Sequence, residues 1–321
     1  MIVDMSIETI GAHFSCIVEN RKNLPPGNYA YESARSALYA LLKSMEIKRI
    51  HVPNYICEAV PEAILKAGGS VIKYPIGSDF KSDGELDIQQ NDLILLVNYF
   101  GLTHEAVLSQ LSHLPKDLVI VDSSQSYFHA SSDCLATIYS ARKFIPVADG
   151  GFVSTVRMLA TEESDDNTSI DRYQYLMKRA VGEPELSREL YLQAENSLEN
   201  VNQRKMSAFS RQIIETADLD FIAKKRRDNF LAFNALSSIN RLDFTLGDQV
   251  PLCYPLMVEN GSKLRQMLLS NRVITPKYWP NITPLNDFEM TLLEDGVFLP
   301  VDHRLGVEHI MRIVDIVRNF S

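Results

Sequence analysis

The chain has 321 residues, and at roughly 150 residues per domain this length predicts two domains with sizeable cores. Its formal charge of −9 counts against binding to nucleic-acid phosphates, and its 45% apolar content excludes wholesale disorder. The four cysteines lie far apart and form no CxxC pair, which excludes a zinc ribbon, a thioredoxin-type motif and a small disulfide scaffold.

The beginning of the chain also limits the class of protein. Residues Met1–Met5 include an acid and no cationic stretch before an apolar run, so they do not form a signal-peptide pattern. No apolar run approaches the ~18 residues that a membrane helix needs. We therefore expect a soluble, cytoplasmic protein, and we predict no metal site.

The first half of the chain alternates between two apolar patterns. Helical spacing of apolar residues predicts a helix from Ala34 to Met45, with Ser33 in the N-cap position. A second helix is predicted at 59–67, where Gly68-Gly69 ends it. Short apolar runs predict strands at 49–52, 70–74, 93–97, 118–121 and 135–139.

These runs show no alternation of apolar and polar residues, which is typical of parallel strands covered by helices on both faces. We predict a doubly wound α/β domain at 1–225 and a smaller carboxyl-terminal α/β domain at 226–321. A basic patch at Lys224–Arg227 lies near this boundary, and we interpret it as the solvated face of a helix.

Polar and aromatic residues follow four of the predicted strands. Ligands of a parallel sheet bind beyond the carboxyl ends of its strands, so these residues are expected to converge. Each has an ordinary alternative: Asp122 caps a helix, Lys143 is a solvated lysine, and Tyr55 is a core aromatic. Ser36 and Ser140 are in the same way explained as cap and turn residues.

Taken together, the residues are better explained by the chemistry of pyridoxal phosphate (PLP) than by a separate structural role for each. This cofactor needs an amine for its aldehyde, an anion beside its ring nitrogen, donors around its phosphate and an aromatic against its ring. A lysine and an aspartate supply the first two groups, and the amino terminus of a helix supplies backbone N–H groups for the phosphate.

Three pieces of sequence resemble the fold-type I PLP-dependent sugar aminotransferases of the DegT/StrS type. They are Asp122–Gln125, then Lys143, and six residues later Asp149-Gly150-Gly151. Weaker similarity extends to Pro53–Cys57 and Leu299–Arg304. The chain departs from the family at Ala34-Arg35-Ser36, where Gly-Thr is usual, and at Ser140, which precedes the lysine by three residues instead of five. The segment Asn202–Met206 preserves the family's Asn-Tyr-Arg-Met pattern poorly.

The resemblance implies roles for particular residues. Lys143 would be the Schiff-base lysine and proton shuttle, Asp122 would pair with the pyridinium, and Gln125 would lie near the phenolic oxygen of the cofactor. Tyr55 would flank the ring. The phosphate would be bound by Ser140 and by the backbone amides of Ala34, Arg35 and Ser36.

The function that the resemblance implies is transfer of an amino group from an amino acid, expected to be glutamate, to a keto-sugar. The sugar would be linked to a nucleotide, the pathway would build a surface polysaccharide, and the enzyme would be a homodimer. Lys143 argues against the family's dehydratases, which carry histidine there. Two alternatives stay open, namely a non-catalytic binding or scaffold protein and a PLP enzyme of another reaction type, such as a lyase. An NAD-linked dehydrogenase is disfavoured because no GxGxxG follows an early strand.

Overall fold

The computed structural model of the chain describes residues 22–46 and 49–320. The prediction about Met1–Met5 and the residue Cys16 lie outside this part of the chain. Within it, Cys57, Cys134 and Cys253 form no disulfide bonds. None of the helices that the structure describes is long and apolar enough to cross a membrane.

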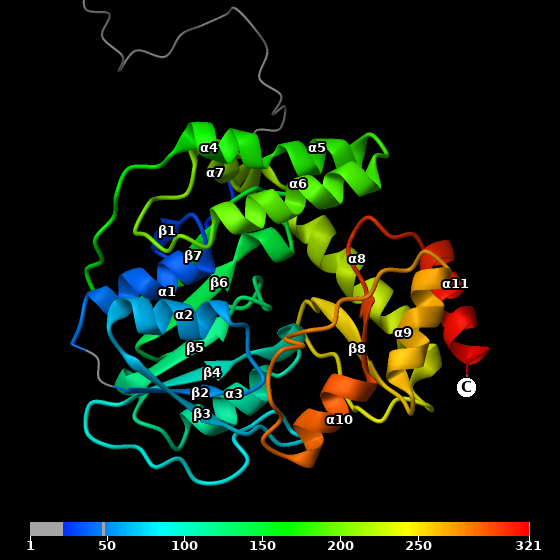
Figure 1. The fold of residues 1–321 in the computed structure, drawn as a ribbon, viewed down its shortest axis with the longest axis horizontal. Helices are drawn as coiled ribbons and strands as arrows, with labels where there is room; N and C mark the ends of the chain where they lie inside the picture. Colours follow the sequence, from blue (N-terminus) through cyan, green and yellow to red (C-terminus); the bar gives the residue numbers. More distant parts are fainter. Residues whose placement is uncertain (1–21, 47–48, 321) are drawn as a thin grey trace, which may run out of the picture.

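Within the described residues, seven strands form one sheet in the order β1-β7-β6-β5-β4-β2-β3 (Figure 1). The five strands from β6 to β3 pair in parallel, and β7 and β1 are antiparallel to their neighbours. The strands are β1 (Tyr29–Tyr31), β2 (Arg49–Pro53), β3 (Ser70–Tyr74), β4 (Leu93–Val97), β5 (Val119–Ser123), β6 (Ala136–Ser140) and β7 (Gly151–Ser154).

Helices cover both faces of this sheet, as the continuous apolar runs predicted. Alternate residues of β4 pack in different clusters: Leu93 and Leu95 lie with α1 and α2, whereas Ile94 and Leu96 lie with α3. The helices are α1 (Ala34–Lys43), α2 (Ala59–Ala67), α3 (His104–Leu111), α4 (Asp166–Arg172), α5 (Gln174–Ala180), α6 (Pro184–Ser197), α7 (Ala208–Thr216), α8 (Leu219–Ala232), α9 (Gly261–Ser270), α10 (Asp287–Asp295) and α11 (Val307–Arg318).

A smaller sheet follows, in which β8 (Cys253–Met257) and β9 (Gly296–Pro300) are antiparallel and α9, α10 and α11 pack nearby (Figure 1). The predicted fold class, a mostly parallel sheet with a smaller carboxyl-terminal α/β part, is confirmed. The predicted boundary between 225 and 226 falls inside α8, so the division of the chain into two domains stays a prediction.

A buried carboxylate joins the two parts of the molecule. Glu289 on α10 is fully buried, and its Oε2 accepts hydrogen bonds from Asn54 Nδ2 at 2.7 Å and Leu285 N at 2.8 Å. Its Oε1 accepts from Ile76 N at 3.1 Å. Because Asn54 directly follows β2, these bonds fix the carboxyl end of that strand against the carboxyl-terminal part.

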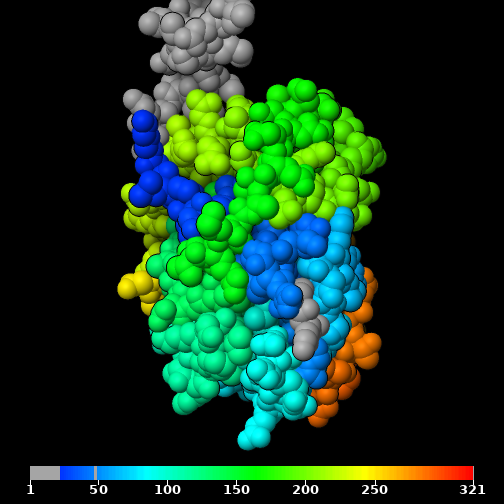
Figure 2. All heavy atoms as spheres, turned by 90° about the vertical axis from the view of Figure 1, so that its left-hand side faces the viewer, coloured from blue at the N-terminus to red at the C-terminus, as the bar shows by residue number. Residues whose placement is uncertain are grey.

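The beginning of the described chain packs beside the segment that follows β7. Figure 2 shows this blue beginning against the green segment. Asn28 bonds this segment twice, donating from Nδ2 to Thr155 O at 2.7 Å and accepting at Oδ1 from Thr155 N at 3.0 Å. These contacts extend the antiparallel pairing of β1 with β7.

The amino end of β4 carries a buried ionic cluster. Asp92 accepts hydrogen bonds from Arg49 Nε at 2.9 Å and Gln89 N at 2.9 Å, and its Oδ2 lies 2.9 Å from His51 Nε2. The hydrogen bonds from Arg49 hold the pKa of Asp92 well below its ordinary value, although burial opposes this. The folded state is thereby stabilised at every pH at which the unfolded carboxyl, with its pKa of about 3.9, is ionised.

We expect Asp92→Asn to lower the free energy of unfolding at pH 7 by about 2–3 kcal/mol, since Arg49 and His51 lose their carboxylate. Because the folded pKa is depressed, the wild-type contribution begins to be lost as the pH falls below about 4, so the difference between the two proteins narrows towards acid. Urea unfolding between pH 3 and pH 7 measures this. The exposed Asp315→Asn is the control, and an equal difference at both ends of the range would contradict the argument.

Candidate active site

A cavity of about 160 Å³ lies where the carboxyl ends of β5 and β6 meet the amino end of α1 and the last turn of α6. Parallel strands place this edge of the sheet where loops and helix amino termini converge. Several residues singled out in the sequence line the cavity together, namely Ala34, Arg35, Asp122, Ser140 and Lys143.

A serine connects the lysine and the aspartate of this cavity. Lys143 Nζ donates to Ser124 Oγ at 3.2 Å, and Ser124 N donates to Asp122 Oδ1 at 2.8 Å. Asp122 is buried at the end of β5 and caps no helix, while Lys143 is exposed at the cavity wall in the 3₁₀ turn η3 (Ala141–Lys143). The ordinary reading of Asp122 as a helix cap is therefore wrong.

The amino terminus of α1 forms another wall of the cavity. Ser33 is its N-cap, as predicted, and Ser33 Oγ accepts from Ser36 N at 3.1 Å. The amide of Ser36 is thus already bonded within the helix, and Ser36 does not line the cavity. The residues of α1 that line the cavity are Ala34, Arg35 and Leu38.

Positions 150 and 151, directly after Asp149, require glycine for two different structural reasons. Gly150 has φ +130°, a conformation that residues with a Cβ rarely adopt. A Cβ on Gly151 would lie 2.0 Å from Ser33 C and 2.1 Å from Ala34 N. Glycine at 151 therefore allows β7 to pass directly beneath the amino end of α1.

We expect Gly151→Ala to lower the stability by about 1–3 kcal/mol, because the added methyl group must displace the backbone of Ser33 and Ala34. Urea denaturation measures the effect. Gly77→Ala is a matched control, since its Cβ would meet side-chain atoms and no backbone, Asp79 Oδ1 at 3.3 Å and Asp83 Cβ at 4.0 Å; equal effects of both substitutions would contradict the prediction.

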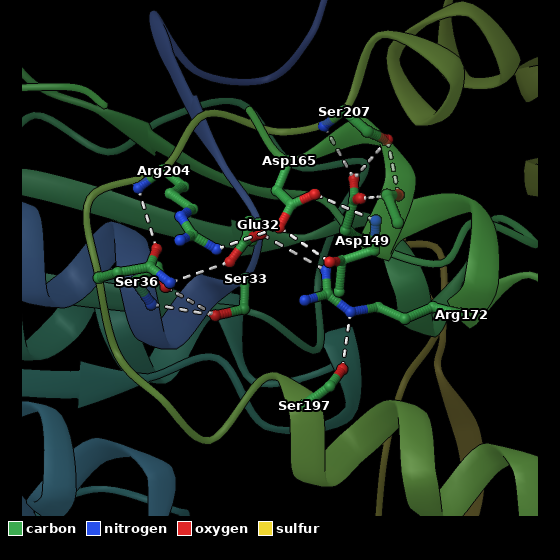
Figure 3. A network of polar contacts seen from close by, with 12 residues as sticks. Glu32, Ser33, Ser36, Asp149, Asp165, Arg172, Ser197, Arg204 and Ser207 are labelled. Atoms are coloured by element: carbon green, nitrogen blue, oxygen red, sulfur yellow. Dashed lines mark hydrogen bonds and ion pairs between the residues drawn. The ribbon is translucent and has the colours of Figure 1, made fainter. Parts of the chain in front are cut away.

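Asp149, the acid of the glycine motif, is fully buried and has a structural role (Figure 3). It accepts hydrogen bonds from Ser169 Oγ and from both Ser207 N and Ser207 Oγ, the last two at 3.2 Å. Ser169 lies on α4 and Ser207 is the N-cap of α7. Asp149 therefore fixes the turn between η3 and β7 to two helices outside the sheet.

A second buried contact in Figure 3 fixes the residue before the N-cap of α1. Glu32 Oε1 lies 3.5 Å from Arg172 Nη1, with both side chains 4% exposed, and Asn202 Nδ2 donates to Glu32 Oε2 at 3.1 Å. Arg172 Nε donates to Ser197 Oγ at 2.7 Å in the last turn of α6. The start of α1 and the cavity wall from α6 are thus held by one polar network.

Arg142 and Glu195 form an ion pair at the rim of the cavity, which both side chains line. Burial is the largest single influence and works against the charged guanidinium, but the charge and hydrogen bond of Glu195, together with Tyr175 and Tyr191, raise the pKa of Arg142. Arg142 lies next to Lys143 in the sequence, and its side chain points to the same cavity. Counting the lining residues, three cationic groups meet two carboxylates there.

Arg226 shows that the interpretation of the basic patch as a solvated face is wrong at this position. It is 3% exposed, its Nη2 donates to Lys143 O at 3.2 Å, and its guanidinium lies 4.6 Å from the Phe144 ring centre. Its Nη1 donates to Pro251 O and Leu252 O, both at 3.2 Å, and burial lowers the pKa of Arg226 to about 10. Carbonyl oxygens compensate this buried charge, so α8 holds the peptide group that carries Lys143.

Tyr55 and Gln125 are not placed in the cavity wall. Tyr55 is fully buried beyond β2, with its ring 4.6 Å from that of Trp279. Gln125 is buried, and its Oε1 accepts from Phe100 N at 2.7 Å. The sequence reasoning missed Cys57, which stands in the cavity wall instead of Tyr55, and also Arg226. Cys57 belongs to the segment Pro53–Cys57, whose weaker similarity to the family was noted above, and this is the signal that could have identified it.

Neither a protein-family model nor a curated protein matches the sequence. Solved structures do match the fold. A DegT/DnrJ/EryC1/StrS aminotransferase from Brucella abortus has a TM-score of 0.63 and 15% identity, over 91% of this chain and 85% of that one. PseC of Helicobacter pylori, an aminotransferase involved in the biosynthesis of pseudoaminic acid, has a TM-score of 0.60 and 16% identity, over 90% and 85%.

A third match is DesI, solved in the presence of its TDP-sugar product, with a TM-score of 0.62 and 16% identity over 91% of this chain and 79% of that one. At such identities the likeness concerns the fold. The chain has the fold of the DegT/DnrJ/EryC1/StrS aminotransferases, which is fold-type I of the PLP-dependent enzymes.

Proposed function

We propose that the chain is a PLP-dependent aminotransferase that moves an amino group from an amino acid, expected to be glutamate, to a nucleotide-linked keto-sugar for a surface polysaccharide. The observation that carries the proposal is the joint lining of one cavity by Lys143, Asp122 and the amino end of α1. Two structural neighbours support a sugar as the acceptor. PseC is an aminotransferase of pseudoaminic acid biosynthesis, and DesI was solved in the presence of its TDP-sugar product.

The residues of the cavity fit the cofactor by their chemistry. Lys143 offers the amine, Asp122 offers a buried anion for the ring nitrogen, and Ser140 offers a hydroxyl donor. Ala34 and Arg35 offer backbone amides at the positive end of α1, where a phosphate is favoured. When bound, PLP withdraws electrons from the substrate carbon whose proton is transferred.

The chain itself then performs binding, orientation and proton transfer. Lys143 Nζ is the group that takes and returns the proton as general base and acid. Ser124 orients it, because its Oγ accepts from Nζ while its backbone N–H holds Asp122. Arg226 Nη2 donates to the backbone carbonyl of Lys143 and so fixes the peptide group there. We further propose that the enzyme acts as a homodimer.

A non-catalytic binding role on the same fold is the second candidate. The specific observation in its favour is the amide of Ser36, which bonds Ser33 Oγ and is not free for a phosphate. The joint presence of Lys143 and Asp122 in one cavity counts against it, because a non-catalytic site requires neither group.

The proposed function is tested by the visible absorption of the purified chain loaded with PLP. We expect L-glutamate to bleach the absorption of the bound cofactor and a nucleotide-linked keto-sugar to restore it, since each half-reaction transfers one amino group. D-glutamate is the matched control. If no amino acid changes the spectrum, the transaminase proposal fails and the binding protein becomes the better account.

A further inference from the structure

The cavity contains one cationic group for which the proposed function has given no role. Of the three cationic side chains that line it, Lys143 supplies the amine, and Arg35 stands on α1 at the end proposed for the phosphate. Arg142 is the third, and its side chain is 15% exposed. Because guanidinium groups bind carboxylates and phosphates in preference to other partners, a guanidinium in the wall of a ligand cavity indicates a place for an anion.

In the described structure, a carboxylate of the chain itself occupies this place. Glu195, in the last turn of α6, forms an ion pair with Arg142 through Oε1 and Nη2. The Nε of Arg142 is buried and finds no acceptor among the residues that the structure describes. A guanidinium binds a carboxylate most strongly when two of its N–H groups donate in parallel. The pair with Glu195 therefore leaves donor capacity on Arg142 unused.

Glu195 can leave Arg142 without any movement of its helix. Its side chain is 37% exposed, so the carboxylate can turn into solvent and regain its hydration. The last turn of α6 is fixed separately, since Arg172 Nε donates to Ser197 Oγ at 2.7 Å (Figure 3). Arg142 is more deeply buried, and a buried charge that loses its partner is strongly destabilising. We therefore expect Glu195 to exchange for another anion instead of leaving the guanidinium unpaired.

The position of Arg142 favours one particular anion. In an amino acid, the amino nitrogen and the α-carboxylate are bonded to the same carbon atom. The group that binds this carboxylate must therefore lie close to the group with which the amine reacts. Arg142 directly precedes Lys143 in the turn η3, and both side chains line the same cavity.

We propose that Arg142 binds the α-carboxylate of the amino donor and that Glu195 is an internal competitor, which occupies Arg142 in the unliganded chain. The inference rests on the proposed function where it identifies the anion as part of an amino acid. The apparent affinity for the donor is then lowered by the fraction of the chain in which Glu195 holds Arg142. Arg142 determines donor specificity, and Glu195 sets the donor concentration that is needed.

Isothermal titration calorimetry of the full chain with glutarate, with and without PLP, tests the exchange without any reaction. Arg142→Gln should lower the affinity for glutarate by about tenfold or more, because it removes the charged donor. Glu195→Gln should raise it by about threefold or more, because it removes the competitor. Arg142→Lys keeps the charge without the fork and should weaken binding severalfold, which keeps the test available if Arg142→Gln does not fold. Neutral glutaramide should not bind.

A second titration identifies the carboxylate. 2-Aminoisobutyrate has an α-carboxylate but no α-proton, and tert-butylamine has a methyl group in place of that carboxylate. Both are followed by the absorption of the PLP-loaded chain. Arg142→Gln should raise the half-saturating concentration of 2-aminoisobutyrate by about tenfold and change that of tert-butylamine little. An equal change for both amines would overturn the assignment to the α-carboxylate.

Arg188→Gln and Glu189→Gln, exposed on α6 and outside the cavity, are the matched controls and should bind glutarate as the wild type does. A purely structural ion pair predicts the opposite sign for Glu195→Gln, so an unchanged or lower affinity in this variant overturns the proposal. It is also overturned if Arg142→Gln weakens the binding of PLP and leaves that of glutarate unchanged, since the guanidinium would then hold the phosphate.

The two proposals fail in different ways. If the glutarate affinities follow the expected pattern while glutamate leaves the cofactor spectrum unchanged, the transaminase proposal fails and the carboxylate site at Arg142 stands. If glutamate changes the spectrum while the variants of Arg142 and Glu195 bind glutarate as the wild type does, the transaminase proposal stands and the assignment of Arg142 fails.

Discussion

Lys143→Ala is expected to slow the reaction with L-glutamate by on the order of 10⁴-fold, because it removes the amine that takes and returns the substrate proton. The side chain is exposed and donates one hydrogen bond to Ser124, so the melting temperature should change little. Single-turnover absorption measurements with PLP and glutamate quantify the loss.

Lys263→Ala provides the matched control, since this lysine is exposed on α9 and lies outside the cavity. It should react at the wild-type rate. If Lys143→Ala reacts as fast as Lys263→Ala, another amine performs the proton transfer and the assignment of Lys143 is wrong. A large drop in melting temperature would instead show that Lys143 supports the fold.

Asp122→Asn is expected to give the second largest effect, on the order of 10³-fold slower removal of the substrate proton. An amide has nearly the shape of the carboxylate and can still accept the hydrogen bond from Ser124 N. It cannot, however, hold a positive charge on the pyridine nitrogen, so the ring withdraws electrons less strongly. The fold and the attachment of the cofactor should both persist.

Stopped-flow absorption with glutamate deuterated at its α-carbon separates this effect from binding. The wild type and Asp122→Asn should bind PLP with similar affinity, and the variant should show the larger isotope effect because proton removal has become slower. Asp315→Asn, exposed on α11, is the control. An unchanged rate in Asp122→Asn would remove this residue from the pyridinium role.

The sequence predicted the sheet well because local patterns determine it. The runs at Leu93–Val97 and Val119–Ser123 are apolar over most of their length, and strands buried on both faces require this composition. The convergence of Asp122 and Lys143 followed from the same topology, since parallel strands end at one edge. The N-cap at Ser33 was equally predictable, because its hydroxyl accepts a hydrogen bond from a backbone N–H in the first turn of α1.

The direction of individual side chains was not predictable from strand ends. Tyr55 follows Asn54, which Glu289 holds from a residue more than two hundred positions later, and this contact turns Tyr55 into the core. Gln125 Oε1 accepts a hydrogen bond from Phe100 N, so the oxygen of its amide group is committed to that backbone. Arg226 lies inside a basic run, and only the folded chain brings carbonyl oxygens around it. These outcomes depend on contacts between distant segments, which the sequence pattern does not contain.

The most direct measurement of the central assignment is borohydride reduction of the wild-type chain incubated with PLP, followed by peptide mass spectrometry. Reduction should attach the mass of the reduced cofactor to the peptide that contains Lys143, and the same treatment of Lys143→Ala should attach none there. Cofactor fixed to a different lysine, or no cofactor mass on any peptide, would contradict the placement of the PLP amine at Lys143.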